Sequence, residues 1–185
     1  VCTACAVGKY SVASDVATCT DCTAGRYVGT TGSAAASDCK ACEAGSITNK
    51  LASTGATTCA ACAVGKYTTA STKACTDCDV GKYAATDASS ACDACSAGKY
   101  QDTAGQGYCK VCLAGSRTNT GTSAGASSCI ACAAGTYSVN STEVACAACE
   151  AGSITNNLAG TGATTCIACA VGRYSNASTV ACTDC

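Results

Sequence analysis

The sequence is organised by a short phrase, C-x-x-C-x-x-G, which recurs along its whole length. Its clearest copy is CAACAVGKY at residues 59–67, and nearly the same phrase opens at Cys2 and Cys166. All 22 cysteines fall into eleven C-x-x-C pairs, and a glycine stands three residues after each of the ten pairs that are followed by more sequence. Self-similarity at a short period indicates a repeat array in which each unit packs on its neighbours, not a globule with one core.

The cysteine content limits the fold classes open to this chain. Twenty-two cysteines in 185 residues are about 12% of the sequence, above the level that indicates a disulfide scaffold. Large apolar side chains are few, with 12 Val, 4 Ile, 3 Leu and no Phe, Trp or Met. Such a chain cannot bury a core in proportion to its length, so cross-links must replace one. We expect a small disulfide-rich fold, an elongated rod of tandem repeats with short irregular β-ladders and almost no helix.

The same composition predicts an extracellular or cell-surface location and argues against several classes of function. Disulfides persist in secreted proteins and are rare in the cytosol. The 11 basic and 12 acidic residues are evenly spread, whereas nucleic acid and anionic membranes require clustered positive charge. No apolar run approaches the roughly 18 residues of a membrane span. The sequence has no histidine and no calcium-loop motif, so we expect no enzyme activity, no cofactor and no metal.

The repeats form one continuous array over residues 1–185, with about ten units of 16 to 20 residues. Short units carry Gly-x-Tyr after the second cysteine, and one long unit does the same at Tyr27. Three other long units carry Ser-x-Thr-Asn instead, at 46–49, 116–119 and 153–156. The pattern indicates two kinds of loop on one scaffold.

A longer, imperfect period is superimposed on the array. Residues 43–78 match residues 150–185 at 29 of 36 positions, 107 residues apart. Within the units no apolar pattern of helical period and length occurs, and glycine with small polar residues fills the gaps, as in turns. We expect strands of two to four residues before each returning cysteine and at Lys9–Val12, Lys66–Thr69 and Lys82–Ala84.

The recurring glycine, tyrosine and aspartate each have a structural interpretation. The glycine allows the chain to turn sharply after the cysteine, since only glycine adopts positive φ cheaply. The tyrosine is the one side chain large enough to cover a disulfide, although a stripe of tyrosines that stacks on carbohydrate is an alternative. Aspartate precedes a cysteine in three TDC triplets, where its carboxylate can accept backbone N–H groups of the turn; these residues are Asp21, Asp77 and Asp184.

Four arrangements of the cysteines are compatible with the spacing. The second cysteine of each pair can bond the first cysteine of the next, which closes loops of 13 to 17 residues and stabilises by about 3 kcal/mol per loop. Two neighbouring pairs can interlock, although eleven pairs leave one over. Each pair can bond internally, which strains a small ring and staples nothing. Four cysteines can also hold zinc, although the odd number of pairs and the absence of histidine argue against it.

The unit C-x-x-C-x-x-G-x-Y, followed by a loop and another C-x-x-C, resembles the cysteine-rich repeats of ephrin-receptor-like and tumour-necrosis-factor-receptor-like ectodomains. The resemblance covers the whole chain, but the proline common before the family's glycine is here Val or Ala, as at Val7 and Ala24. In those repeats the cysteine before Gly-x-Tyr bonds the first cysteine of the next pair. The resemblance therefore implies ten disulfides: Cys5–Cys19, Cys22–Cys39, Cys42–Cys59, Cys62–Cys75, Cys78–Cys92, Cys95–Cys109, Cys112–Cys129, Cys132–Cys146, Cys149–Cys166 and Cys169–Cys182.

Two functions compete for such an array. The first is structural: a stiff, disulfide-stapled stalk, fibre or filament whose partners are copies of itself, head-to-tail or side by side, because a solenoid-like array repeats its surface at fixed intervals. The second is a ligand-binding or adhesion segment of a receptor ectodomain. Binding surfaces rely on Trp, Tyr and Arg anchors, and the chain offers only Tyr108 outside the repeated tyrosine position and three arginines, Arg26, Arg117 and Arg173.

Two N-x-Ser/Thr sequons predict attached glycans, at Asn140 in NST and Asn176 in NAS. Both asparagines follow the tyrosine of their unit by two or three residues, where a loop should face solvent. Removal of N-glycans from protein made in a secretory host should lower the mass of the two peptides that contain them. A polypeptide of unmodified mass at both positions would contradict the prediction.

Overall fold

Ten disulfides divide the chain into successive closed loops in a computed structural model, which describes residues 3–12, 18–140 and 145–185. Each bond joins the second cysteine of one C-x-x-C pair to the first cysteine of the next, with a sequence separation of 13, 14 or 17. The Cα atoms of each pair lie 5.6 to 5.8 Å apart, which is ordinary disulfide geometry. We number the loops 1 to 10 in chain order, from Cys5–Cys19 to Cys169–Cys182.

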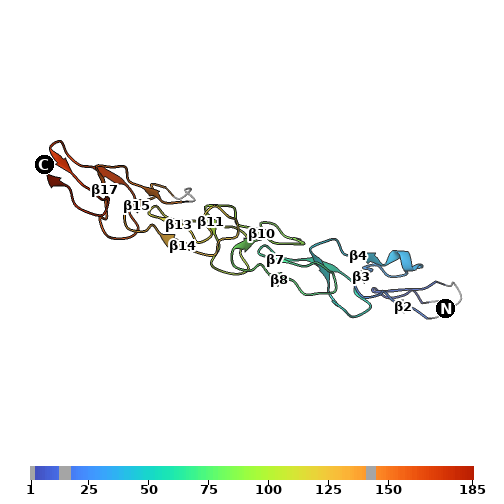
Figure 1. The fold of residues 1–185 in the computed structure, drawn as a ribbon. Helices are drawn as coiled ribbons and strands as arrows, with labels where there is room; N and C mark the ends of the chain where they lie inside the picture. Colours follow the sequence, from blue (N-terminus) through green and yellow to red (C-terminus); the bar gives the residue numbers. More distant parts are fainter. Residues whose placement is uncertain (1–2, 13–17, 141–144) are drawn as a thin grey trace. The chain divides into compact units, whose positions relative to one another are not determined.

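Each disulfide closes a minimal antiparallel hairpin, and these hairpins account for all strands of the described residues (Figure 1). The residues after the glycine of the motif pair with the next C-x-x-C: Lys9 lies opposite Asp21, and Tyr10 lies opposite Thr20. The pairs, in chain order, are β1 (Lys9–Tyr10) with β2 (Thr20–Asp21), β3 (Arg26–Tyr27) with β4 (Lys40–Ala41), β5 (Ser46–Thr48) with β6 (Cys59–Ala61), β7 (Lys66–Tyr67) with β8 (Thr76–Asp77), β9 (Lys82–Tyr83) with β10 (Asp93–Ala94), β11 (Lys99–Tyr100) with β12 (Lys110–Val111), β13 (Ser116–Thr118) with β14 (Cys129–Ala131), β15 (Thr136–Tyr137) with β16 (Ala147–Ala148), β17 (Ser153–Thr155) with β18 (Cys166–Ala168), and β19 (Arg173–Tyr174) with β20 (Thr183–Asp184).

The position of the returning strand differs from the prediction. We expected it before the returning cysteine, but β2 begins after Cys19 and β6 begins at Cys59 itself. The disulfide fixes the first cysteine at the closed end of the hairpin, so the next two residues are the ones that reach the partner strand. The first strands are also shorter than predicted, as β7 ends at Tyr67 and not at Thr69.

The interior is made of sulfur and small side chains. The third residue after each motif glycine is buried in eight of the ten loops: Val28, Thr48, Thr68, Ala84, Gln101, Thr118, Ser138 and Thr155. Val28 forms one cluster with the Cys22–Cys39 disulfide, and the Tyr10 ring of the preceding loop packs against it. The prediction that tyrosine shields a disulfide therefore holds for Tyr10, while the position that is buried most regularly lies one residue further along.

Polar groups at this buried position are satisfied by nearby backbone. The hydroxyls of Thr48, Thr118 and Thr155 donate to carbonyls three residues ahead, at 3.1, 2.9 and 2.9 Å. The side-chain amide of the fully buried Gln101 donates to the carbonyl of Tyr108 at 2.6 Å. Among the described residues, every buried side-chain N or O atom has a hydrogen-bond partner. These hydrogen bonds offset the desolvation penalty of burying the polar groups.

The chain forms two compact units by its internal contacts. The first contains residues 1–78, 83–93 and 105–107, and the second contains residues 79–82, 94–104 and 108–185. Both have the same small disulfide-rich architecture, and the helical content of the described part is one 3-10 turn, η1 (Ala36–Asp38). None of the helical segments in the described residues is long and apolar enough to span a membrane.

The bonded pairs can be tested directly. Digestion of the unreduced protein should release peptides cross-linked through Cys62–Cys75 in the first unit and Cys132–Cys146 in the second. A C-x-x-C pair bonded to itself, such as Cys59 to Cys62, would give a different set of linked masses. Detection of such masses, or of bound zinc, would contradict the structure.

Candidate functional site at the joints between loops

The joint between successive loops is the feature that the chain repeats most faithfully. Several motif glycines lie against the backbone of the second following loop; they are Gly8, Gly45, Gly65, Gly81 and Gly115. Four of these five, all except Gly45, also donate their amide to a carbonyl of the next loop. The amide of Gly8 in loop 1 donates to the carbonyl of Val28 in loop 2 at 2.8 Å, and its own carbonyl accepts the amide of Cys22 at 2.9 Å. A Cβ built on Gly8 would meet the carbonyl of Gly55 in loop 3. Backbone therefore fills the place that side chains fill in an ordinary core.

The same contacts recur in both units. In the first, Gly65 donates to the carbonyl of Ala84 at 2.9 Å and accepts the amide of Cys78 at 2.9 Å; in the second, Gly115 donates to Ser138 at 2.9 Å and accepts the amide of Cys132 at 2.8 Å. A third bond runs back from the following loop to the carbonyl of a second cysteine. Its examples are Gly55 to Cys22 at 2.9 Å, Gly105 to Cys78 at 2.8 Å, Gly125 to Cys95 at 2.7 Å and Gly162 to Cys132 at 2.8 Å.

Contacts with the second following loop also occur through side chains. The hydroxyl of Ser71 in loop 4 donates to the carbonyl of Gly25 in loop 2 at 3.1 Å, and Ser178 in loop 10 donates to Gly135 in loop 8 at 3.1 Å. Ser178 is also the hydroxyl residue of the NAS sequon. Loops 2 and 8 are thus each held by a loop two positions further along the chain. Such contacts pack three successive disulfide-closed loops as one group.

Ion pairs bridge the open ends of several hairpins. The TDC aspartates accept from a cation on the opposite strand, not from turn amides as we expected: Lys9 to Asp21 at 2.7 Å, Lys66 to Asp77 at 2.6 Å and Arg173 to Asp184 at 2.7 Å. The strand register places each cation directly opposite its aspartate, and this pairing decides the orientation of the carboxylate.

Two of the carboxylates have shifted pKa values. The hydrogen bond from Lys9 holds the pKa of Asp21 below its ordinary value. In loop 6, the hydrogen bond from Lys110 lowers the pKa of Asp102, and the same bond raises the pKa of Lys110. All these groups are exposed, so water and salt screen the pairs and their contribution to stability is small. Their geometry nevertheless shows which charged side chains already form an ion pair within the chain.

An asparagine ties the two arms of each Ser-x-Thr-Asn loop together. The Asn49 side-chain oxygen accepts the amide of Thr57 at 3.0 Å, and its nitrogen donates to the Thr57 hydroxyl at 2.8 Å. Asn119 makes the equivalent bonds to Ser127, and Asn156 makes them to Thr164. In these three long loops the asparagine closes the extra residues that short loops lack.

The other residues singled out in the sequence are the two sequon asparagines and the two cysteines outside the ten disulfides. Asn176 is exposed, and Asn140 is exposed beside residues 141–144, which lie outside the described residues. Cys185 is an exposed free thiol, and Cys2 lies outside the described part. No group of three or more metal-ligating side chains gathers within the described ranges, where twenty of the cysteines are in disulfides.

The buried third position after the glycine was missed by the sequence analysis. Its residues are of five types, Val, Thr, Ala, Gln and Ser, so no residue pattern marks it. The available signal was its fixed distance from the glycine, three residues, at which the residue is buried in eight of the ten loops.

Comparison with known proteins finds a similar repeat in part of the chain. The family model described as tyrosine-protein kinase ephrin type A/B receptor-like matches twice, at residues 81–129 and 120–166. A search of curated proteins found no match. The matched residues span loops 6 to 9 completely, and the same cysteine and glycine spacing continues on both sides of them.

Two glycines in loops of the same type test the joint. Gly115 and Gly152 both precede Ser-x-Thr-Asn and have φ of +78° and +77°. A Cβ on Gly115 would meet the carbonyl of Gly162, two loops further along. Only one loop follows loop 9 within residues 1–185, and a Cβ on Gly152 there would meet nothing within 4 Å. Both Gly→Ala changes carry the cost of positive φ, about 1–2 kcal/mol. Gly115→Ala should cost roughly 1–3 kcal/mol more, the usual penalty of overpacking.

Local opening free energies from hydrogen exchange are the appropriate measurement, because an array does not unfold as a single unit. Gly115→Ala should speed exchange in loops 7, 8 and 9, and Gly152→Ala should have the smaller effect. Equal effects of the two substitutions would mean that the close approach of Gly115 to Gly162 contributes nothing to the local opening free energy.

Proposed function

We propose that this chain, an array of ephrin-receptor-like cysteine-rich repeats, is a structural segment of a secreted or cell-surface protein. It acts as a stiff, disulfide-stapled stalk that keeps other parts apart, and copies of it assemble into fibres or filaments. Dense disulfides and a receptor-like extracellular repeat support the location.

The observation that carries the proposal is the second-neighbour contact at the motif glycine. In the first unit Gly45 meets Ala88, and in the second Gly81 meets Gly125, in each case two loops further along. A hinge between two loops would break both the contact to the next loop and the contact beyond it. This overlap opposes bending within each unit, which is the property that a stalk requires.

The surface chemistry also supports a structural role. All three arginines bond within the chain. Arg26 donates to the carbonyl of Cys39 at 2.9 Å, and Arg173 pairs with Asp184. Arg117 donates to the carbonyl of Thr118 at 3.4 Å. Six of the seven tyrosines that follow the motif glycine are half-buried: Tyr10, Tyr27, Tyr67, Tyr83, Tyr100 and Tyr137. Few anchors for a tight protein interface remain.

A receptor ectodomain segment that binds a ligand or mediates adhesion is the second candidate, and the match to an ephrin-receptor-like model favours it. Tyr108 lies outside the repeated tyrosine position and is 60% exposed. Under this reading the repeats are the support, and the ligand contacts lie on the few residues that differ between loops.

Glycans and self-association complete the proposal. A glycan on the exposed Asn176 would protrude from loop 10 without disturbing the disulfides. Copies of the chain would associate through the repeated surface, head-to-tail or side by side, since identical repeats present the same groups at fixed intervals.

Small-angle scattering with negative-stain microscopy tests the proposal on residues 1–185. A compact domain of this length has a radius of gyration near roughly 16 Å, and an unfolded chain one near roughly 46 Å. A stiff stalk should give a value well above the compact one with a rod-like profile, and fibres should grow with concentration. Reduction should abolish the rod-like profile.

Two results would argue against a stalk. A radius near the compact value would contradict the stalk. Monodisperse particles that form no fibres but capture a soluble protein ligand would favour the receptor segment.

A further inference from the structure

Loop 2, closed by Cys22–Cys39, departs from every other long loop. Four loops have a disulfide separation of 17, and in three of them an asparagine four residues after the motif glycine ties the arms together. In loop 2 that position is Gly29. The loop has the length of a Ser-x-Thr-Asn loop and lacks the side chain that closes one.

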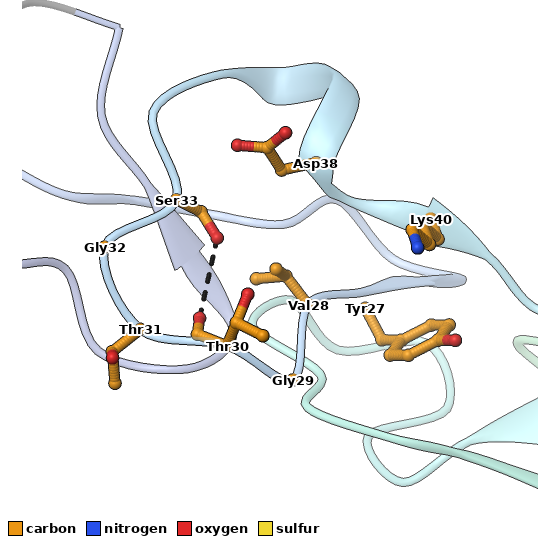
Figure 2. Close-up of a pocket in the computed structure, with 9 residues that line it drawn as sticks. All are labelled: Tyr27, Val28, Gly29, Thr30, Thr31, Gly32, Ser33, Asp38 and Lys40. Atoms are coloured by element: carbon orange, nitrogen blue, oxygen red, sulfur yellow. Dashed lines mark hydrogen bonds between the residues drawn. The ribbon is translucent and has the colours of Figure 1, made fainter.

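A hollow lies beside Gly29 in loop 2. Its extra residues are held at the base by η1, where the Asp38 carboxylate accepts the amides of Ala34 and Ala35 at 2.9 and 3.1 Å. The hollow has a volume of about 620 Å³, within the range of small-molecule sites. Its lining is drawn in Figure 2: Tyr27, Val28, Gly29, Thr30, Thr31, Gly32, Ser33, Asp38 and Lys40.

The lining combines one aromatic ring, an apolar floor and a polar rim. Val28 is buried and Tyr27 is half-buried, whereas Thr30 and Thr31 are exposed at the edge. Figure 2 shows Val28 between Asp38 and Thr30, with Lys40 and Tyr27 both to the right of Val28. Tyr27 and Lys40 are direct partners across β3 and β4, so the sheet holds the ring and the ammonium on one face.

Loop 6 shows why Lys40 is available. It repeats the same cross-strand pair, Tyr100 opposite Lys110, and the Lys110 ammonium lies 5.9 Å from the ring centroid. There the ammonium is committed to Asp102 at 2.6 Å. Asp102 stands four residues after its motif glycine, the position that Gly29 occupies in loop 2.

Gly29 therefore removes two closures at once, the asparagine tie of the long loops and the aspartate partner of the lysine. Lys40 takes part in none of the ion pairs formed among the described residues. One ammonium and one carboxylate in the lining cancel in charge, so the hollow exerts no net attraction on an anion.

We propose that the loop 2 hollow is a binding site for a neutral saccharide. A sugar presents a C–H face that packs on the Tyr27 ring and hydroxyls that both donate and accept. Lys40 donates to those hydroxyls, and Asp38, with the threonine hydroxyls, accepts from them. A purely apolar ligand would leave these polar groups unpaired, which disfavours it. This site is independent of whether the chain serves as a stalk or as a receptor segment.

Saturation-transfer NMR on unglycosylated residues 1–185 tests the site with glucose, galactose, mannose, N-acetylglucosamine and their β-linked disaccharides as probes. At least one should receive saturation through its C–H protons. Lys40→Ala and Tyr27→Leu should each weaken its affinity tenfold or more, and Tyr27→Phe should retain it. The matched changes in loop 6, Lys110→Ala and Tyr100→Leu, should leave it within twofold.

Lys40 is exposed, so its truncation leaves the fold intact even where Tyr27→Leu disturbs loop 2; the linked disulfide peptides verify this for each variant. Absence of transfer to every probe would overturn the proposal. Equal losses from the loop 2 and loop 6 changes would also overturn it. A preference for sulfated or carboxylated saccharides over the neutral probes would replace it with simple attraction to the lysines.

Discussion

Backbone packed on backbone at the motif glycine is the contact on which this structure depends. The amide and carbonyl of Gly8 both bond to loop 2, and its Cα face lies against Gly55 of loop 3. A side chain at the glycine would hold the strands apart and break all three contacts. This close approach explains a composition rich in Ala, Gly, Ser and Thr, because larger residues would prevent the loops from reaching one another.

Disulfides and hydrogen bonds stabilise the array in different ways. Each disulfide closes a loop of about 15 residues and stabilises mainly by limiting the unfolded chain, by about 3 kcal/mol in the entropy model. A bond that only restricts the unfolded state does not specify how one loop meets the next. The amide-to-carbonyl bonds, such as Cys132 to Gly115, supply that orientation. Because contacts also reach the second loop ahead, cooperativity extends further than in an array that couples only nearest neighbours.

The residue four positions after the motif glycine differs between loops and changes how each loop is closed, while the scaffold stays the same. Asparagine there ties a long loop closed, as Asn49 does with Thr57. Aspartate there captures a lysine, as Asp102 does with Lys110. Glycine there offers neither closure in loop 2, where Lys40 takes part in none of the ion pairs among the described residues. Variation at a single site thus changes local surface chemistry without altering the disulfides or the joints.

The sequence by itself determined the repeat, the disulfide-rich class, the need for glycine after each pair and the two kinds of loop. These properties are local and are written in spacing and residue type. From the residues alone the cysteine pairing stayed open among four arrangements, and the resemblance to receptor repeats was needed to choose one.

Only the tertiary structure decided which residues meet between loops. Asp21 was expected to bond its own turn, but the strand register places Lys9 opposite it. The buried position occupied by Gln101 or Thr118 has no common residue type, because what buries it is the backbone of the following loop. Backbone contacts between loops far apart in sequence leave no side-chain signature, so neither the second-neighbour joints nor the hollow beside Gly29 could be predicted from residue patterns.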